Sequence, residues 1–338
     1  MSDLPQPLKS RLSVAPMMDW TDRHCRYFHR LMSKRAELYT EMVTADAVIH
    51  GDRERLIGFD PTEHPVILQL GGSDAVKLAE AARIGADFGY DAINLNCGCP
   101  SDRVQSGTFG ACLMRDPAHV ATLVEAMKRA VDIPVTVKCR IGVDDQNAEE
   151  ALPSFIAAVR DAGVDAVIVH ARKAWLQGLS PKENRDVPPL DYDLVLAMKA
   201  QFPDLWMGIN GGISSMDQAE HLLAKGMDEV MIGRAAYQAP GNVLMQADAV
   251  LYGDPPSTQS RSDVVRAMLP YIDSHLAKGG RLNQITRHMI GLFAGLPGAR
   301  QWRRILSEGA HLEGAGPDLV LQTLAAVERS DMQKATAA

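Results

Sequence analysis

Eight short apolar segments alternate with longer amphipathic segments along the first three quarters of the chain. The strand candidates are residues 12–15, 37–42, 65–70, 92–96, 134–138, 166–170, 206–210 and 229–233. Helical patterns follow most of them, over 74–88, 117–131, 149–162, 193–202 and 215–225. Eight strand–helix units in about 240 residues predict a (β/α)8 barrel. A doubly wound open sheet is the alternative, but it seldom needs eight parallel units, and no GxGxxG turn follows the first strand.

The composition changes after the last of these units. Residues 251–260 contain Gly, Pro and Ser in the proportions typical of a linker. Helical patterns then run over 262–278, 282–296, 300–308 and 318–329. We therefore expect a barrel domain over 1–250, a linker over 251–260 and a smaller all-helical domain over 261–338.

Charge is distributed unevenly between these two expected domains. The chain has a net charge of −7, but residues 255–338 hold ten Lys and Arg against seven Asp and Glu. Arg300, Arg303 and Arg304 follow one another at helical spacing and share a face, and no acidic residue occurs over 281–304. A solvated face or internal ion pairs would explain this pattern, and so would a surface that contacts phosphate groups.

Cysteine usage and hydropathy indicate the compartment. Five cysteines, an odd and scattered number, are typical of reduced thiols. Cys-Gly-Cys has no second ligand pair, so we expect no metal site. No apolar run approaches the roughly 20 residues of a membrane span, and the first residues lack a secretory segment. We expect a cytoplasmic protein that binds no membrane and needs no obligate protein partner.

Polar side chains occur where five successive strand candidates end. In a barrel, inward-facing residues at the carboxyl ends of the strands form the functional site. Residue alternation places Lys138 inside, opposite Val135 and Val137. The residues at equivalent levels are Gln69, Asn94, Asn96, Lys138, His170 and Asn210. A shared site explains them better than isolated solvated termini.

The segment 92–113 carries the most reactive chemistry. The strand over 92–96 leaves the sheet through Cys97-Gly98-Cys99-Pro100. Cys97 continues the outward side of the strand, whereas Cys99 lies in the loop beyond it. A loop thiol can act as a nucleophile, a metal ligand or a proton donor.

Two glycine-containing loops follow the last two strands. Asn210 precedes Gly211 and Gly212, and Gly233 precedes Arg234 at the start of a short helix. Glycines let backbone N–H groups approach a phosphate closely, and these are the loops that hold phosphate in such barrels. With inward amides and a lysine, they favour a flavin mononucleotide site. A Schiff-base aldolase using Lys138 is the mechanistic rival.

Several motifs, in order, resemble the tRNA-dihydrouridine synthases over about residues 12–330. They are Ala15-Pro16-Met17-Met18-Asp19, Gln69-Leu70-Gly71-Gly72, Asn94-Leu95-Asn96 with Cys99-Pro100-Ser101, Val137-Lys138-Cys139-Arg140, His170-Ala171-Arg172, Asn210-Gly211-Gly212 and Ile232-Gly233-Arg234. The segments 178–185, 286–288 and 297–300 resemble the A-type subfamily, which modifies D-loop uridines at positions 20 and 20a.

The resemblance implies an NADPH-dependent FMN enzyme in which hydride passes from the flavin to C6 of a flipped-out uracil and Cys99 protonates C5. It implies flavin contacts by Pro16, Met17, Met18, Gln69 and Lys138, and phosphate or ribityl contacts by His170, Asn210, Gly211, Gly212, Gly233 and Arg234. The resemblance also implies contacts with the substrate or with tRNA by Asn96, Arg140, Lys182, Arg185, Arg287, Arg300 and Arg303. The expected partner is the D-loop and elbow of tRNA.

One position departs from the family pattern. We expect a small apolar residue where this chain has Cys97, so two thiols compete for the role of acid, and strand parity favours Cys99. Two functional rivals remain: an FMN reductase of a free pyrimidine, which needs no basic helical domain, and a tRNA-binding barrel without catalysis.

Overall fold

The computed structural model describes residues 10–100 and 109–337, with side chains as far as residue 329. Ser101, part of the cysteine motif, lies outside the described residues. The chain divides into two compact units. The barrel unit comprises Met1–Asp19, Ala36–Ile213 and Asp217–Gly233, and the helical unit comprises Trp20–Arg35, Ser214–Met216 and Arg234–Ala338.

The barrel unit is built on a closed parallel sheet, which confirms the predicted (β/α)8 barrel and excludes the open sheet. β1 pairs with β2 on one side and with β9 on the other, and β2 pairs in turn with β4, which closes the ring of eight strands. A short additional strand, β3 (Val43–Thr44), pairs with β4. The eight barrel strands are β1 (Leu12–Val14), β2 (Glu37–Tyr39), β4 (Val66–Gly71), β5 (Ala92–Cys97), β6 (Val135–Arg140), β7 (Ala166–His170), β8 (Trp206–Asn210) and β9 (Glu229–Ile232).

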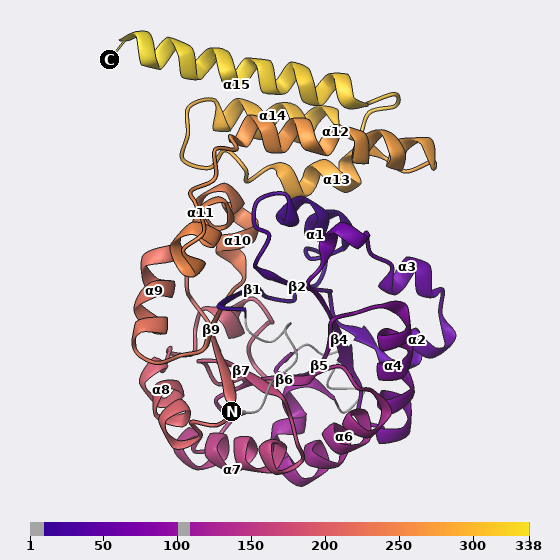
Figure 1. Cartoon of the computed structure of the whole chain (residues 1–338), viewed down its shortest axis with the longest axis vertical. Helices are drawn as coiled ribbons and strands as arrows, with labels where there is room; N and C mark the ends of the chain where they lie inside the picture. The colour runs from indigo at the N-terminus through magenta and orange to yellow at the C-terminus, as the bar shows by residue number, and fades with distance from the viewer. Residues whose placement is uncertain (1–9, 101–108, 338) are drawn as a thin grey trace. The chain divides into compact units, whose positions relative to one another are not determined.

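Helices surround these strands on the outside of the barrel (Figure 1). Asp and Asn side chains begin several of them, because their oxygens accept the first free N–H groups; Asp74 does so for α4 and Asp116 for α6. The helices of the unit are α2 (Ala45–His50), α3 (Arg53–Ile57), α4 (Ala75–Phe88), α6 (Pro117–Ala130), α7 (Ala148–Asp161), α8 (Tyr192–Gln201) and α9 (Met216–Ala224), with 3-10 turns η2 (Pro61–Glu63), η3 (Gly110–Arg115) and η4 (Glu183–Arg185).

The strand expected over 37–42 is shorter in the structure, where β2 ends at Tyr39 and β3 begins only at Val43. Thr40 interrupts it, because its hydroxyl oxygen accepts the N–H of Gln69 at 3.0 Å and its own O–H donates to the Glu41 carbonyl. The Thr40 side chain thus takes the place of a backbone hydrogen-bond partner in the sheet, and pairing with β4 resumes only at Val43. The other strands lie within two residues of their expected bounds.

The inside of the barrel is filled by side chains from alternating strand positions. A buried layer consists of Ala15, Tyr39, Ile67, Ala92, Ile168 and Met231. Toward the amino ends of the strands the interior is polar, where the Ser13 hydroxyl and the Trp206 indole N–H donate to the carboxylate of Glu229. This packed interior leaves the carboxyl ends of the strands as the position for chemistry.

Glu229 is expected to make the protein less stable as the pH rises. Burial raises the pKa of this carboxyl group from 4.5 to about 7, although its hydrogen bonds oppose the shift. A group whose pKa is higher in the folded state contributes stability that is fully present below its unfolded pKa and is lost as the pH rises through its folded pKa. Glu229→Gln should therefore raise the free energy of unfolding by up to about 3 kcal/mol above pH 7 and change it little near pH 4.5.

Thermal unfolding at these two pH values measures this effect. The exposed Glu220→Gln on α9 is the matched control and should change neither melting temperature. A gain for Glu229→Gln that is equal at both pH values would contradict titration as its cause.

The helical unit has its own apolar core. Trp302 is fully buried, packs edge-on against Phe293 with ring centroids 4.9 Å apart, and donates its indole N–H to the Met289 carbonyl. None of the helices within the described residues is long and apolar enough to cross a membrane. The helices of the unit are α1 (Arg23–Arg30), α10 (Arg234–Gln238), α11 (Pro240–Tyr252), α12 (Arg261–Ala277), α13 (Leu282–Met289), α14 (Ala299–Gly309) and α15 (Pro317–Ala337).

The helical unit includes α1, although α1 follows the first barrel strand in the chain. Asp22 accepts the N–H groups of His24 and Cys25 at the start of α1, forms an ion pair with Arg287 of α13 and is hydrogen-bonded to His288 Nε2. Burial would raise the pKa of the Asp22 carboxyl group, but its bonds with His288 and the Cys25 N–H outweigh burial and hold the pKa well below its usual range. The expected barrel boundary at residue 250 therefore differs from the structure, in which α1, α10 and α11 pack with the later helices.

Candidate active site

The polar side chains expected to share a site lie at neighbouring register positions of the barrel. Gln69 pairs with Asn94, Asn96 with Lys138, and His170 with Asn210. All are at the carboxyl ends of β4 to β8, on the inward parity. The fold therefore brings together the inward residues that sequence alternation selected.

Three amide side chains form one hydrogen-bonded chain across β4, β5 and β6. Asn96 Nδ2 donates to Gln69 Oε1 at 2.9 Å, and Gln69 Nε2 donates to Asn94 Oδ1 at 2.8 Å. Asn94 Nδ2 in turn donates to Thr136 Oγ1 at 2.8 Å. The chain of bonds fixes every amide orientation, so Gln69 keeps one N–H available for a ligand, and so does Asn96.

Lys138 is the cation of the site. Its Nζ donates to Asn210 Oδ1 at 3.1 Å, and Asn210 Nδ2 donates to the Met231 carbonyl at 2.7 Å. Burial, together with the nearby Arg140, lowers the pKa of the ammonium group from 10.5 to about 8. A lysine with this pKa gains much from an electron-rich partner that would stabilise its charged form.

The loop that follows β5 presents Cys99, which is partly exposed. Asn96 Oδ1 accepts the N–H groups of Gly98 and Cys99 at 3.1 and 3.0 Å, and the N–H of Ala111 donates to the Cys99 carbonyl at 2.9 Å. Asn96 thus anchors the cysteine loop in addition to facing the site. Cys97 is fully buried, and burial raises the pKa of its thiol far above the ordinary value.

Arg140 has a different position from the one expected of a tRNA contact. It is 3% exposed. Its Nε donates to the Gly98 carbonyl at 2.9 Å, and one terminal nitrogen donates to the carbonyls of Lys173 and Asn184 at 3.1 and 2.8 Å. Arg140 therefore ties the cysteine loop to the loop after β7.

A glycine cradle follows β8. Gly211 and Gly212 have φ values of +115° and +67°, which favour glycine. A Cβ added to Gly211 would lie 2.7 Å from His170 Cδ2, so the backbone and the imidazole are in close contact. Burial holds the pKa of His170 well below its ordinary value, with Arg140 and Lys138 contributing.

The first barrel strand supplies the apolar side of the site. Met17 is buried, whereas Met18 is 51% exposed, and Pro16 is half-buried. A Cβ added to Gly233 would lie 3.5 Å from Met17 Sδ, so the loops after β1 and β9 meet. Arg234 directly follows Gly233 and begins α10.

These features fit a flavin mononucleotide. The glycine cradle admits a phosphate close to backbone N–H groups, and Lys138 offers a cation from the barrel interior. The available N–H group of Gln69 suits a carbonyl oxygen of an isoalloxazine ring.

Gly211→Ala is expected to abolish most flavin binding. The added methyl group would press on His170 at 2.7 Å, and φ of +115° strains any residue with a Cβ by about 1–3 kcal/mol. Flavin absorbance per chain, measured after purification and after incubation with FMN, checks this. Gly226→Ala is the matched control, because Gly226 has φ of +107° but nothing within 4 Å of an added Cβ. Equal flavin loss in both variants would show that backbone strain alone is responsible.

The basic residues expected to contact tRNA occupy three kinds of position. Lys182 is exposed in the loop after β7, and Arg185 in the same loop is half-buried. Arg300, Arg303 and Arg304 are exposed on α14, and the opposite side of α14 buries Trp302. Arg287 is held by its ion pair with Asp22. Arg287 lies on α13, not on the arginine face of α14, so the internal ion pair accounts for this one basic residue only.

Sequence reasoning missed two residues that support the site. Asn184 is fully buried, and its side-chain amide donates to the Trp175 carbonyl and accepts the Trp175 N–H. The hydroxyl of Tyr192 donates to the Gly211 carbonyl and so supports the cradle. Neither residue follows a strand end; Asn184 belongs to the segment 178–185 that resembles the A-type subfamily, but that resemblance gave it no role.

The site therefore defines an oxidoreductase barrel built for a flavin cofactor. The family model described as Dihydrouridine synthase (Dus) matches residues 13–330, and the chain belongs to this family. Dihydrouridine synthases are NAD(P)H-dependent flavin oxidoreductases that act on tRNA. The A-type resemblance agrees with the names of the relatives.

Three curated relatives illustrate the similarity. A tRNA-dihydrouridine(20/20a) synthase of Shewanella oneidensis is 59% identical over 313 residues, which cover 93% of this chain and 92% of that protein. The protein of the same name from Xanthomonas campestris pv. campestris is 58% identical over 324 residues, covering 96% and 94%. That from Synechocystis sp. is 55% identical over 315 residues, covering 93% and 94%.

Proposed function

We propose that this protein reduces uridines 20 and 20a in the D-loop of tRNA to 5,6-dihydrouridine, with FMN as cofactor and NADPH as hydride donor. The observation that carries the proposal is the family membership together with the meeting of Lys138, His170 and the Cys99 loop at one end of the barrel. The names of the relatives support the two positions.

FMN would be held by groups from six strands. Gly211, Gly212 and Gly233 would admit its phosphate, with His170 and Arg234 beside it and Asn210 positioning Lys138. Pro16, Met17 and Met18 would face its ring, and Gln69 and Lys138 would bond the ring oxygens. When bound, FMN supplies the hydride that reaches C6 of the uracil.

The protein's own part in the reduction is to place the base and to deliver a proton. The target uridine must leave the base stack, because its C5 and C6 are otherwise covered by neighbouring bases. Asn96 would hold the extruded ring with its remaining N–H, and the Cys99 thiol would donate a proton to C5. Because Asn96 also bonds the backbone at Cys99, one residue orients both reacting partners.

The exposed cations would bind the tRNA backbone. Lys182 and Arg185 lie in the loop after β7, and Arg300 and Arg303 lie on α14. Such contacts act over about 8 Å at physiological salt, so local cations can outweigh the net charge of −7. Arg140 and Arg287 would act indirectly, by bracing the loops that they bond. The supply of NADPH and tRNA points to the cytoplasm.

The experiment is reduction of unmodified tRNA by the purified, FMN-loaded protein with NADPH. We expect a mass gain of two hydrogens at positions 20 and 20a, located by nuclease digestion and mass spectrometry. NADH in place of NADPH tests the donor. Free uridine tests the rival pyrimidine reductase, and turnover of free uridine without turnover of tRNA would overturn the proposal. Flavin that NADPH reduces but tRNA does not reoxidise would also overturn it.

A further inference from the structure

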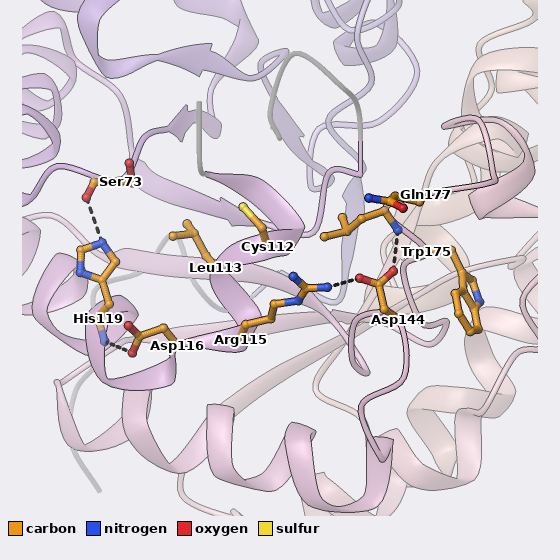
Figure 2. Close-up of a pocket in the computed structure, with 10 residues that line it drawn as sticks. Ser73, Cys112, Leu113, Arg115, Asp116, His119, Asp144, Trp175 and Gln177 are labelled. Carbon is orange, nitrogen blue, oxygen red and sulfur yellow. Dashed lines mark hydrogen bonds and ion pairs between the residues drawn. The ribbon is translucent and has the colours of Figure 1, made fainter. Parts of the chain in front are cut away.

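A pocket of about 890 Å³ lies beside the cysteine loop in the barrel unit (Figure 2). Its wall includes η3 and the start of α6 on one side and the loop after β7 on the other. The described residues that line it are Ser73, Cys112, Leu113, Arg115, Asp116, His119, Asp144, Trp175, Leu176 and Gln177. The mechanism above uses none of these side chains.

Trp175 is the unusual member of this lining. It is 40% exposed, although tryptophan is costly to leave in water. The Lys173 ammonium group lies 5.6 Å from the centre of its ring and is itself fixed by a 2.6 Å bond to the Gln146 carbonyl. The indole thus has a cation against it and still presents a large apolar area to the pocket.

The backbone around Trp175 is held on both sides. Asn184, fully buried, accepts the Trp175 N–H at 2.7 Å and donates to its carbonyl at 2.8 Å. The next residue, Leu176, donates its N–H to Asp144 Oδ1 at 2.8 Å, and Asp144 forms an ion pair with Arg115. The backbone that carries the exposed indole is therefore held in place by the protein's own hydrogen bonds.

Hydrogen bonds connect the Trp175 loop to the cysteine loop. Arg140 bonds the carbonyl of Gly98, which precedes Cys99, and the carbonyl of Lys173, two residues before Trp175. On the other side, Ala111 bonds the Cys99 carbonyl and is followed by Cys112 in the pocket wall. A single guanidinium group thus spans the distance from the cysteine loop to the tryptophan loop.

The charges of the lining indicate which part of a nucleotide it would take. Arg115 is paired with Asp144, and Asp116 caps α6, so the wall holds one paired cation and two carboxylates. That balance does not attract a phosphate, whereas a neutral planar base gains from stacking on an indole. Both carboxylates already accept hydrogen bonds from the protein, and stacking on an aromatic ring is tolerant of which base is stacked.

We propose that Trp175 is a stacking platform for the base next to the target uridine on the tRNA strand. The inference rests on the proposed activity toward tRNA. Stacking there would hold the strand in its opened conformation while the uridine is extruded toward Cys99. Trp175 is thus a positioning residue, whose contribution depends on the presence of a neighbouring base and not on its identity.

The test combines a protein variant with an altered RNA. Trp175→Ala should lower kcat/KM for tRNA by roughly 5- to 150-fold, mainly through KM, because a base on an aromatic ring contributes on the order of that factor. Trp175→Phe keeps a ring and should stay within about threefold of the wild type. An abasic nucleotide on one of the two sides of the target uridine should lower the kcat/KM of the wild type by the same factor. With that abasic tRNA, Trp175→Ala should have the same kcat/KM as the wild type.

Three controls separate the explanations. Flavin content and the rate of flavin reduction by NADPH without tRNA should be unchanged in Trp175→Ala, and its melting temperature should stay above the assay temperature. Val187→Ala removes another exposed apolar side chain, 61% exposed and outside the pocket lining, and should have no effect. If the loss caused by Trp175→Ala and the loss caused by base removal simply add, Trp175 does not stack on that base and the proposal is wrong. Slower flavin reduction by NADPH in Trp175→Ala would also overturn it, because the pocket would then bind NADPH. A wild type that forms no dihydrouridine would overturn the proposed activity itself.

Discussion

Replacing Cys99 by alanine is expected to lower the rate of tRNA reduction by about 10²- to 10⁴-fold, the usual contribution of a positioned general acid. Flavin should remain bound and reducible by NADPH, because the bonds of the cysteine loop are made by its backbone and survive the change. Single-turnover reoxidation of the reduced protein by unmodified tRNA measures this step directly.

Cys97→Ala is the matched control for this prediction. Cys97 is fully buried on the outward side of β5, where burial disfavours loss of its proton. We expect it to keep flavin and activity and to lose on the order of 1 kcal/mol of stability. Activity of Cys99→Ala equal to that of the wild type, or a comparable loss in Cys97→Ala, would refute the assignment of the acid.

Lys138→Met is expected to weaken FMN binding by roughly 10- to 150-fold, the factor that corresponds to about 1.5–3 kcal/mol for a hydrogen bond to a charged group. Asn210 would also lose the partner of its Oδ1. Titration of the flavin-free protein with FMN, followed by flavin fluorescence, gives the dissociation constant. Lys128→Met is the control, because its ammonium bonds Asp165 beside the amino end of β6 and should leave the affinity unchanged.

The affinity for FMN should also depend on pH through Lys138. Its pKa of about 8 in the flavin-free protein would rise when an anionic or electron-rich group binds beside it. The contribution of the charged lysine to FMN affinity is then fully present below pH 8. It is lost as the pH rises from 8 through the pKa of the complex, where the affinity falls by up to tenfold per pH unit. In Lys138→Met this dependence should disappear, and a wild-type affinity that stays constant up to pH 10 would exclude a charged lysine in binding.

Local sequence was sufficient for the barrel because each strand–helix unit carries its own signals. Apolar strands, capping residues such as Asp74 and Asp116, and loop glycines lie within a few positions of one another. The same alternation selected Gln69, Asn96, Lys138 and His170, since inward parity at a strand end is a local property. Their roles toward flavin and tRNA remain predictions.

Element ends were less predictable where distant residues decide them. The helix expected over 282–296 ends at Met289. A Cβ at Gly291 would lie 2.4 Å from the Gln238 carbonyl oxygen, so the chain there packs against a segment about fifty positions earlier. Gly295, with φ of +82°, then turns the chain.

The sequence by itself determined the closed parallel barrel, the inward polar residues and the preference for Cys99 over Cys97, because periodicities of two and 3.6 residues record which side chains face the interior. Only the tertiary structure decided that α1 belongs to the helical unit, that Arg140 braces two loops, and that Trp175 is held open by Asn184. The first two depend on contacts between residues far apart in the chain, and the third on a side chain that bonds backbone groups across a nine-residue loop, and the periodicity of strands and helices encodes none of these pairings.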